Sequence, residues 1–279
     1  MYYVGTDEAG YGPLLGPLVI AATVFRSDGP RASLAADGVG DSKRVYARRG
    51  RAGLAEVLRP CFDCELDLGR LLASHSVRND PRASYPWYGD ARETCTEARV
   101  APDGFHAVRI NPMCEQEFNA ACAQDGSKGT VLFRETMRVL RGALTTVPEG
   151  EEVDVLCDKH GGRRRYGELL MAEWGPSRLV VERESATHSS YRMTADGRSM
   201  RVRFLAKADA LDPPVSLASM AAKFVRELFM VSLNEFFVSR QADLRPTAGY
   251  AVDGRRFLDD VRPLLARLDV PVDSFVRAR

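Results

Sequence analysis

Four carboxylates that lie far apart in the sequence are the side chains best suited to chemistry. Asp7 and Glu8 follow a short β-rich run, Asp158 ends another such run, and Glu227 lies in a long, mostly apolar segment. Carboxylates that meet in a fold repel one another unless a cation neutralises them, and hard oxygen ligands select Mg²⁺ or Mn²⁺. If these four side chains meet, we expect them to hold two divalent ions and to support hydrolysis of phosphodiester bonds.

Three further residues are reserve candidates, and two of them also have an ordinary structural interpretation. His160 lies two residues after Asp158, where an imidazole could move protons, although a loop histidine bonded to the backbone is more common. Arg163 could contact a phosphate, although a basic cluster is usually a solvated surface. Asp209 could join the carboxylates.

The glycines after Glu8 do not make a nucleotide-binding loop. The spacing of Gly10, Gly12 and Gly16 does not match a dinucleotide motif, and Pro13 lacks an N–H that a phosphate would need. The two acids just before these glycines would also repel a pyrophosphate. The turn is therefore better explained as part of a carboxylate site.

A sheet is needed to bring these residues together, and the sequence predicts one. Alternation of β-rich runs with helical patterns is typical of an α/β fold. We expect strands at residues 2–6, 18–25, 153–157 and 179–183, a hairpin at 189–205, and helices at 43–58, 115–124, 130–144, 166–174, 214–237 and 255–268. Because parallel strands end at one edge of a sheet, Asp7 and Asp158 should converge there.

The predicted architecture is a central mixed five-stranded sheet flanked by helices. Residues 1–279 should form one catalytic domain, with an insertion at about 60–110 and an extra β-hairpin at about 189–205. The segment 214–237 is apolar nearly all round. Its polar stripe should face either solvent or a site, and it consists of Ser216, Ser219, Lys223, Arg226 and Glu227.

Composition narrows the class of protein without naming a partner. The net charge is +1 over 279 residues, which argues neither for nor against nucleic acid. No apolar run is long enough to cross a membrane, and the chain opens without a leader pattern. Six scattered cysteines suit a reducing compartment, so we expect a cytoplasmic location. Oligomeric state is left open.

Several motifs resemble the type 2 ribonucleases H, in that family's order. GTDEAGYGPLLGPLVIAA at residues 5–22 is similar to the family's opening signature, and DSK at 41–43 to a second segment. KAD at 207–209, SLASMAAKFVRE at 216–227 and GY at 249–250 are similar to later ones. The resemblance implies a ribonuclease H fold and two-metal cleavage of the RNA strand in RNA/DNA hybrids by Mg²⁺ or Mn²⁺.

The resemblance also implies roles for individual residues. It gives Asp7, Glu8, Asp158 and Glu227 as metal ligands, and it places Lys43 and Lys223 near substrate phosphates. Recognition of an RNA-to-DNA junction would fall to Gly10, Tyr11, Gly12 and Tyr250.

Three departures from the family pattern bear on specificity. Tyr11 stands where the family has Arg, Glu227 stands where we align an Asp, and the loop at 159–165 is unusual and basic. Glu at the fourth position suits the type 3 branch, so the branch is left open.

Two alternative functions fit the same residues. One is a nuclease of this fold that acts on another nucleic acid, because the junction-reading Arg is missing. The other is a nucleic-acid-binding protein without turnover, because sequence alone does not show that the four acids meet. Both alternatives keep nucleic acid as the partner.

Overall fold

A seven-stranded mixed sheet forms the centre of the protein. The computed structural model describes residues 1–34, 39–95 and 99–278. The strand order is β3-β2-β1-β4-β7-β6-β5, with β1 parallel to β4, β4 parallel to β7, and the other neighbours antiparallel. The strands are β1 Tyr2–Ala9, β2 Leu18–Arg26, β3 Phe105–Met113, β4 Val153–Asp158, β5 Arg178–Glu184, β6 His188–Ala195 and β7 Arg198–Leu205. The predicted α/β class is confirmed.

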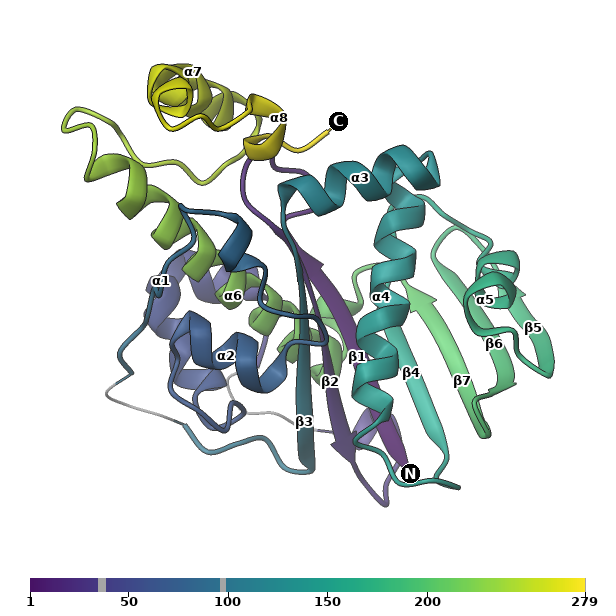
Figure 1. Cartoon of the computed structure of the whole chain (residues 1–279). Helices are drawn as coiled ribbons and strands as arrows, with labels where there is room; N and C mark the ends of the chain where they lie inside the picture. The colour runs from purple at the N-terminus through teal and green to yellow at the C-terminus, as the bar shows by residue number, and fades with distance from the viewer. Residues whose placement is uncertain (35–38, 96–98, 279) are drawn as a thin grey trace.

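Helices cover the sheet on both faces, with α4 and α5 on one side and α6 on the other (Figure 1). The helices are α1 Ser42–Leu58, α2 Leu68–His75, α3 Glu115–Asp125, α4 Lys128–Leu144, α5 Gly167–Trp174, α6 Pro213–Val238, α7 Ala251–Arg267 and α8 Val272–Phe275. Short 3₁₀ turns occur at Arg31–Ser33, Pro81–Ser84 and Ala208–Ala210. Each predicted helix is present, with ends shifted by at most four residues.

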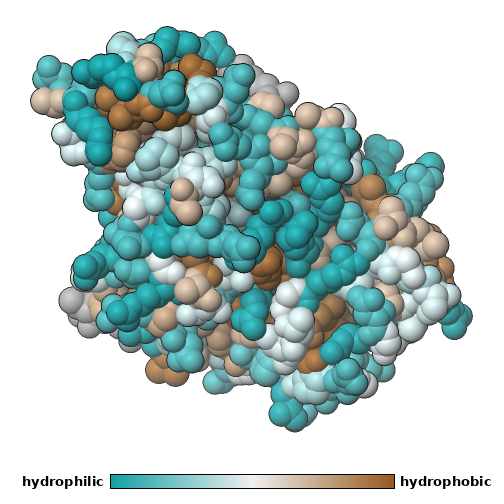
Figure 2. Space-filling model, in the orientation of Figure 1, coloured by the Kyte–Doolittle hydropathy of each residue, from teal (hydrophilic) through white to brown (hydrophobic). Residues whose placement is uncertain are grey.

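Alternation along the strands separates two cores. In β1, Tyr2 and Val4 point to the core under α4, while Tyr3 points to the core under α6. On the outside, hydrophilic residues cover most of the face drawn in Figure 2. In the described part of the chain, no helix has the length and hydropathy that a membrane crossing needs.

The start of α6 is fixed tightly against β1. The Asp212 side chain accepts a hydrogen bond from the Val215 N–H at 3.1 Å and caps the helix, whose first two residues are prolines. Gly5 makes the close approach possible, since a Cβ there would lie 2.3 Å from the Pro214 carbonyl carbon. The polar stripe of α6 is therefore held at a set height along β1.

The sheet differs from the predicted one in two ways. The predicted hairpin at 189–205 exists as β6 and β7, but β7 pairs with β4 inside the main sheet, and β5 and β6 extend it to seven strands. Sequence patterns favour a hairpin between neighbours but do not show which distant strand will pair with it. Strand β3 was not predicted from the sequence, because Pro112 is unfavourable inside a strand and the residues before it show no regular alternation of apolar and polar side chains.

The described parts of the predicted insertion, residues 60–95 and 99–110, contain more regular structure than their many glycine and proline residues suggested. They contain α2 and an aromatic cluster in which Trp87, 1% exposed, packs against Tyr85, Tyr88 and Phe275. Contacts with distant residues, rather than local periodicity, hold this segment in place.

Candidate metal centre

Strands β1, β4 and β7 end at one edge of the sheet (Figure 1). Four residues with carboxylate side chains lie at or just after these strand ends. Asp7 and Asp158 lie one residue beyond the paired positions Thr6 and Cys157, and Glu8 follows Asp7. The fourth is Asp209, in the 3₁₀ turn that follows β7. We call Asp7, Glu8, Asp158 and Asp209 the acid corner.

Hydrogen bonds tie the acid corner together. Asp158 Oδ1 accepts the Ala208 N–H at 2.8 Å, which fixes the turn after β7 to the end of β4. The Ser216 hydroxyl, in the first turns of α6, donates to the Asp209 carbonyl. The Ser219 hydroxyl, one turn further along α6, bonds the Asp7 carboxyl. These hydrogen bonds position the carboxyl groups of Asp7 and Asp158 and the backbone of Asp209.

The carboxyl groups of the acid corner act strongly on one another. Burial raises the pKa of Asp7 to about 7, and the charges of Asp158 and Asp209 add to the rise against the Ser219 hydrogen bond. Burial, then the charges of Asp7, Asp158 and Asp209, raise the pKa of Glu8 well above its usual value. Burial and the Asp209 charge also raise the pKa of Asp158. The acids are thus close, dehydrated and short of positive charge.

Lys43 is the cation that acts on two of these acids. It lies in the first turn of α1, where the Asp41 side chain caps the helix. Its charge opposes the rise in pKa of both Glu8 and Asp158. Lys43 is exposed and close enough for its charge to act on the acid corner, and its contact with a substrate phosphate stays a prediction.

Glu227 is not part of the acid corner. Its carboxylate accepts a hydrogen bond from the Tyr46 hydroxyl at 2.8 Å and pairs with Lys223 at 3.3 Å. Glu227 follows Ser219 by eight residues, which places it ~12 Å further along the axis of α6. Asp209, the reserve candidate, occupies the place that the sequence suggested for Glu227. In the sequence, Asp209 was marked only by the KAD motif at residues 207–209. The fold is needed to show that the turn carrying this motif lies beside the end of β4.

The donor set of the acid corner fits a hard divalent cation. As the side chains stand, no three His, Cys, Asp or Glu residues of the described ranges converge on one point that would enclose an ion. The chemistry nevertheless matches, because buried carboxylates with raised pKa values lack the positive charge that Mg²⁺ or Mn²⁺ supplies. The acid corner is therefore the candidate metal centre.

The loop that follows β1 is clamped by two buried arginines. Arg226 donates to the carbonyl groups of Leu15 and Ala248 at 3.2 and 3.1 Å. Arg277, near the C-terminus, donates to the carbonyl groups of Tyr11 and Pro13 at 3.3 and 2.6 Å. No sequence pattern singled out Arg277, whose role depends on the chain end returning to this loop.

Tyr250 also lies beside this loop. The Gly249 carbonyl accepts the N–H groups of Leu14 and Leu15, and a Cβ on Gly249 would lie 2.5 Å from the Leu15 oxygen. The Tyr250 ring is 52% exposed and lies 5.4 Å from the Arg226 guanidinium. The predicted junction-reading residues, Gly10, Tyr11, Gly12 and Tyr250, are thus held around one loop.

His160 packs in a core and points away from the acid corner. Its ring lies edge-on to Phe133, Tyr166 and Phe204, and Nε2 is 3.3 Å from the Thr136 hydroxyl. Burial, helped by the charge of Arg163, lowers the pKa of His160 to about 3. A neutral ring in this position has a packing role; its polar contact is to the Thr136 side chain rather than to the backbone bond that the structural interpretation expected.

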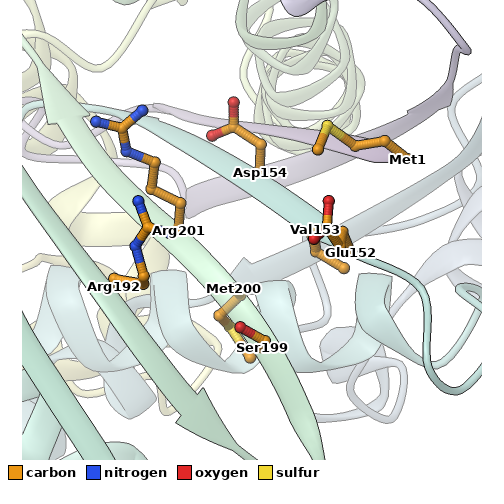
Figure 3. A pocket seen from close by; sticks show the side chains of 8 residues that line it. All are labelled: Met1, Glu152, Val153, Asp154, Arg192, Ser199, Met200 and Arg201. Carbon is orange, nitrogen blue, oxygen red and sulfur yellow. The ribbon is translucent and has the colours of Figure 1, made fainter.

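A cavity of about 220 Å³ lies at the other end of the sheet (Figure 3). Its walls include Met1, Asp154, Arg192 and Arg201, near the start of β1 and β4. It is separated from the acid corner by the length of these strands and takes no part in the candidate site.

Part of the chain is similar to a known protein family. A family model described as Ribonuclease HII matches residues 4–87, which include Asp7, Glu8, the clamped loop and Lys43. A search of curated protein sequences finds no match.

Solved structures resemble the chain along nearly its whole length. Bst-RNase HIII in complex with Mn²⁺ has a TM-score of 0.55 at 16% identity, covering 99% of this chain and 66% of that one. RNase HII of Archaeoglobus fulgidus, from a complex with PCNA, has a TM-score of 0.48 at 19% identity, covering 100% and 95%. Ribonuclease H2 of Pyrococcus horikoshii OT3 has a TM-score of 0.46 at 16% identity, covering 99% and 92%. The likeness to Bst-RNase HIII establishes a shared fold.

Proposed function

We infer that this chain, a divergent member of the type 2 ribonuclease H family, cuts the RNA strand of RNA/DNA hybrids with two divalent metal ions. One observation carries the inference: four carboxyl groups from three distant parts of the chain act on one another at a single edge of the sheet. Such a cluster stores repulsion that a bound cation would relieve.

The metal ligands that we propose are Asp7, Glu8, Asp158 and Asp209. When bound, two divalent ions would activate a water molecule and stabilise the charge on the leaving oxygen. The neighbour Bst-RNase HIII was solved with Mn²⁺, which makes Mn²⁺ the first ion to test, followed by Mg²⁺. We assign Glu227 a different role, which is to hold Lys223 through their ion pair.

The chain's own residues bind and orient the substrate in this proposal. The Ser219 hydroxyl holds the Asp7 carboxyl, and the Ala208 N–H holds Asp158. Lys43 and Lys223 supply positive charge for substrate phosphates, as the family resemblance implies. The clamped loop offers Gly10, Tyr11 and Gly12 to the strand that is cut, with Tyr250 beside them.

A cleavage assay distinguishes this proposal from both alternatives. Labelled RNA/DNA hybrid, duplex DNA with one ribonucleotide, duplex DNA and duplex RNA are incubated with Mn²⁺ or Mg²⁺. We expect cleavage of the hybrid. Cleavage of duplex DNA alone would support a same-fold nuclease with another substrate. Hybrid binding without cleavage in either metal, unaffected by Asp7→Asn, would support a binding protein.

The fourth ligand is tested by comparing Asp209→Asn with Glu227→Gln. Asp209→Asn should abolish cleavage and the rise in Tm that Mn²⁺ causes, whereas Glu227→Gln should keep that rise. The reverse result would restore Glu227 to the metal site. Action of the whole chain as one domain and a cytoplasmic location stay predictions.

A further inference from the structure

Arg163 lies beside Tyr11, in the loop between β4 and α5. Its Nη2 atom is 3.2 Å from the position that a Cβ on Gly129 would take, and the Tyr11 hydroxyl is 4.0 Å from the same position. Gly129 is in the first turn of α4. The missing side chain of Gly129 therefore leaves the space in which the guanidinium and the hydroxyl approach each other.

The Arg163 guanidinium has no hydrogen bond or ion pair with any residue that the structure describes. Its neighbour Arg165, which is 88% exposed, pairs with Glu184 at 3.8 Å. Arg163 is only partly exposed, so its charge is less hydrated than that of a free surface arginine. An unpaired, partly buried guanidinium is a strong donor for an anion.

The Tyr11 hydroxyl lies within reach of charges from both the acid corner and the basic side chains. Burial raises the pKa of Tyr11, the charge of Glu8 adds to the rise, and the charges of Arg163 and Arg277 oppose it. The Tyr11 hydroxyl therefore keeps its proton at neutral pH and can donate a hydrogen bond.

Lys43 and Arg163 flank the acid corner from opposite sides of the sheet. Lys43 is on α1, which packs with α6, whereas Arg163 lies against α4 on the other face (Figure 1). A strand that crosses the corner with a phosphate at the acids would carry further phosphates toward both cations. The spacing of successive phosphates along a strand is regular, so each flanking cation meets the backbone whatever the sequence.

We propose that Arg163, together with the Tyr11 hydroxyl, binds a backbone phosphate of the strand that is cut, on the α4 side of the acid corner. This inference rests on the proposed nuclease function and extends it to a specific contact. The contact reads backbone and not bases, because a guanidinium and a hydroxyl match phosphate oxygens. Arg163 thus supplies a cation next to the position where the family pattern has Arg and this chain has Tyr11.

The test measures hybrid binding in the Asp7→Asn background and cleavage in the otherwise unchanged protein. Arg163→Gln should weaken hybrid binding and raise KM about tenfold, with a smaller change in kcat, since one charged contact contributes roughly that factor. The slope of log Kd against log salt should fall by about one. Arg163→Lys should recover part of the affinity.

Two variants control for general effects. Arg165→Gln removes an equal charge from the same loop, where the side chain is exposed and already ion-paired, and should change the Kd by less than about twofold. Gly129→Ala keeps every charge but puts a methyl group 3.2 Å from Arg163 Nη2, so it should weaken binding in the direction of Arg163→Gln. Alanine also favours the helix, so the variant should fold.

The outcomes separate this inference from the proposed function. Unchanged Kd and salt slope in Arg163→Gln, in a protein that cuts hybrid, would overturn the Arg163 contact and leave the nuclease intact. Failure of the unchanged protein to cut any nucleic acid would overturn the nuclease, while weaker hybrid binding by Arg163→Gln would still support the contact. Equal losses in Arg163→Gln and Arg165→Gln would also overturn a specific contact.

Discussion

The carboxyl groups of Asp7, Glu8 and Asp158, whose pKa values are raised, each cost the metal-free fold free energy. Asp7 is 8% exposed and faces two other acids, so its ionised form is less stable in the folded chain than in the unfolded one. The same groups would gain most from a cation. Their arrangement is therefore explained by binding rather than by stability, and the two effects can be measured separately.

Asp7→Asn should abolish cleavage and stabilise the metal-free protein by about 4 kcal/mol at pH 8, since each unit of the rise in pKa corresponds to ~1.4 kcal/mol. The pKa of Asp7 is raised from its unfolded value to about 7, so its penalty is complete above pH 7. The penalty shrinks as pH falls and is absent below about pH 4, where the carboxyl is neutral in both states. Thermal melts of metal-free protein from pH 4 to pH 8 test this. A lower Tm for the variant at pH 8 would contradict it.

Three of the four acids in the acid corner could be identified from the sequence. The sequence did not show whether Asp209 or Glu227 is the fourth. Asp7, Glu8 and Asp158 stand at strand ends, a position that local patterns show. Asp209 reaches the corner only because β7 pairs with β4 and the Ala208 N–H bonds Asp158. Arg277 and Glu115, which hold the loop after β1 through Pro13 and Gly16, depend on still more distant contacts.

The contact between β1 and α6 sets the height of the polar stripe over the acids. Gly5 allows this contact, and Ser219 lies one and a half turns after the helix start that packs on it. Helix positions were predictable because apolar periodicity and caps are local signals. Their fit against a particular strand was not, since it depends on which residues of both elements meet.

Gly5→Ala should separate β1 from α6. The new Cβ would lie 2.3 Å from backbone atoms of Pro214 and Val215, which cannot give way as a flexible side chain can. We expect a loss of about 3 kcal/mol in the free energy of unfolding. Urea denaturation checks this value. Ala218→Gly on α6 is a control that adds no side-chain volume. If Gly5→Ala is as stable as the wild type, the tight contact between β1 and α6 is contradicted.

Glu135 connects α4 to the segment after α2 and to β3. Its buried carboxylate pairs with Arg78, and Asn111 donates to it at 3.0 Å. Burial opposes ionisation, but the Arg78 and Asn111 hydrogen bonds outweigh it and hold the pKa of Glu135 below its usual value. The ionised group therefore stabilises the fold at neutral pH.

Glu135→Ala should cost roughly 3 kcal/mol at pH 7, because Arg78 loses its buried carboxylate partner and keeps only the more exposed Glu117 at 3.6 Å and the neutral Asn111. The contribution of an acid with a lowered pKa is complete above pH 4.5 and is lost as pH falls through the folded-state pKa. The difference in free energy of unfolding between the wild type and Glu135→Ala, measured by chemical denaturation, should therefore become smaller below pH 4.5. A difference in free energy of unfolding that stays constant down to pH 3 would contradict a stabilising role for the ionised Glu135 carboxylate.

The C-terminal segment packs against the loop that follows β1, beside the candidate site. The Arg277 N–H bonds the Leu14 carbonyl at 3.0 Å, and Asn119 bonds the carbonyl groups of Asp273 and Val276. The C-terminal tail thus holds the loop that carries Tyr11. Seven strands, rather than the expected five, complete the sheet on which this loop rests.

Arg277→Met should raise KM for hybrid about fivefold or more while changing kcat less, since the loop loses two carbonyl partners and the acids do not. Steady-state kinetics test this split, and the Mn²⁺-induced rise in Tm should persist. Arg277→Lys should rescue part of the effect. Loss of the Mn²⁺ response would show that the tail also supports the acids.

The central pairing of β1 with β4 has a consequence for how the protein is made. Residues 2–6 find their parallel partner only at 153–157, and Asp209 comes later still in a chain of 279 residues. A ribosome must therefore release most of the polypeptide before the acids can assemble, and contacts of such long sequence separation form slowly. Until then β1 and β2 present an open edge, so the nascent chain depends on rapid completion or on chaperones to escape aggregation.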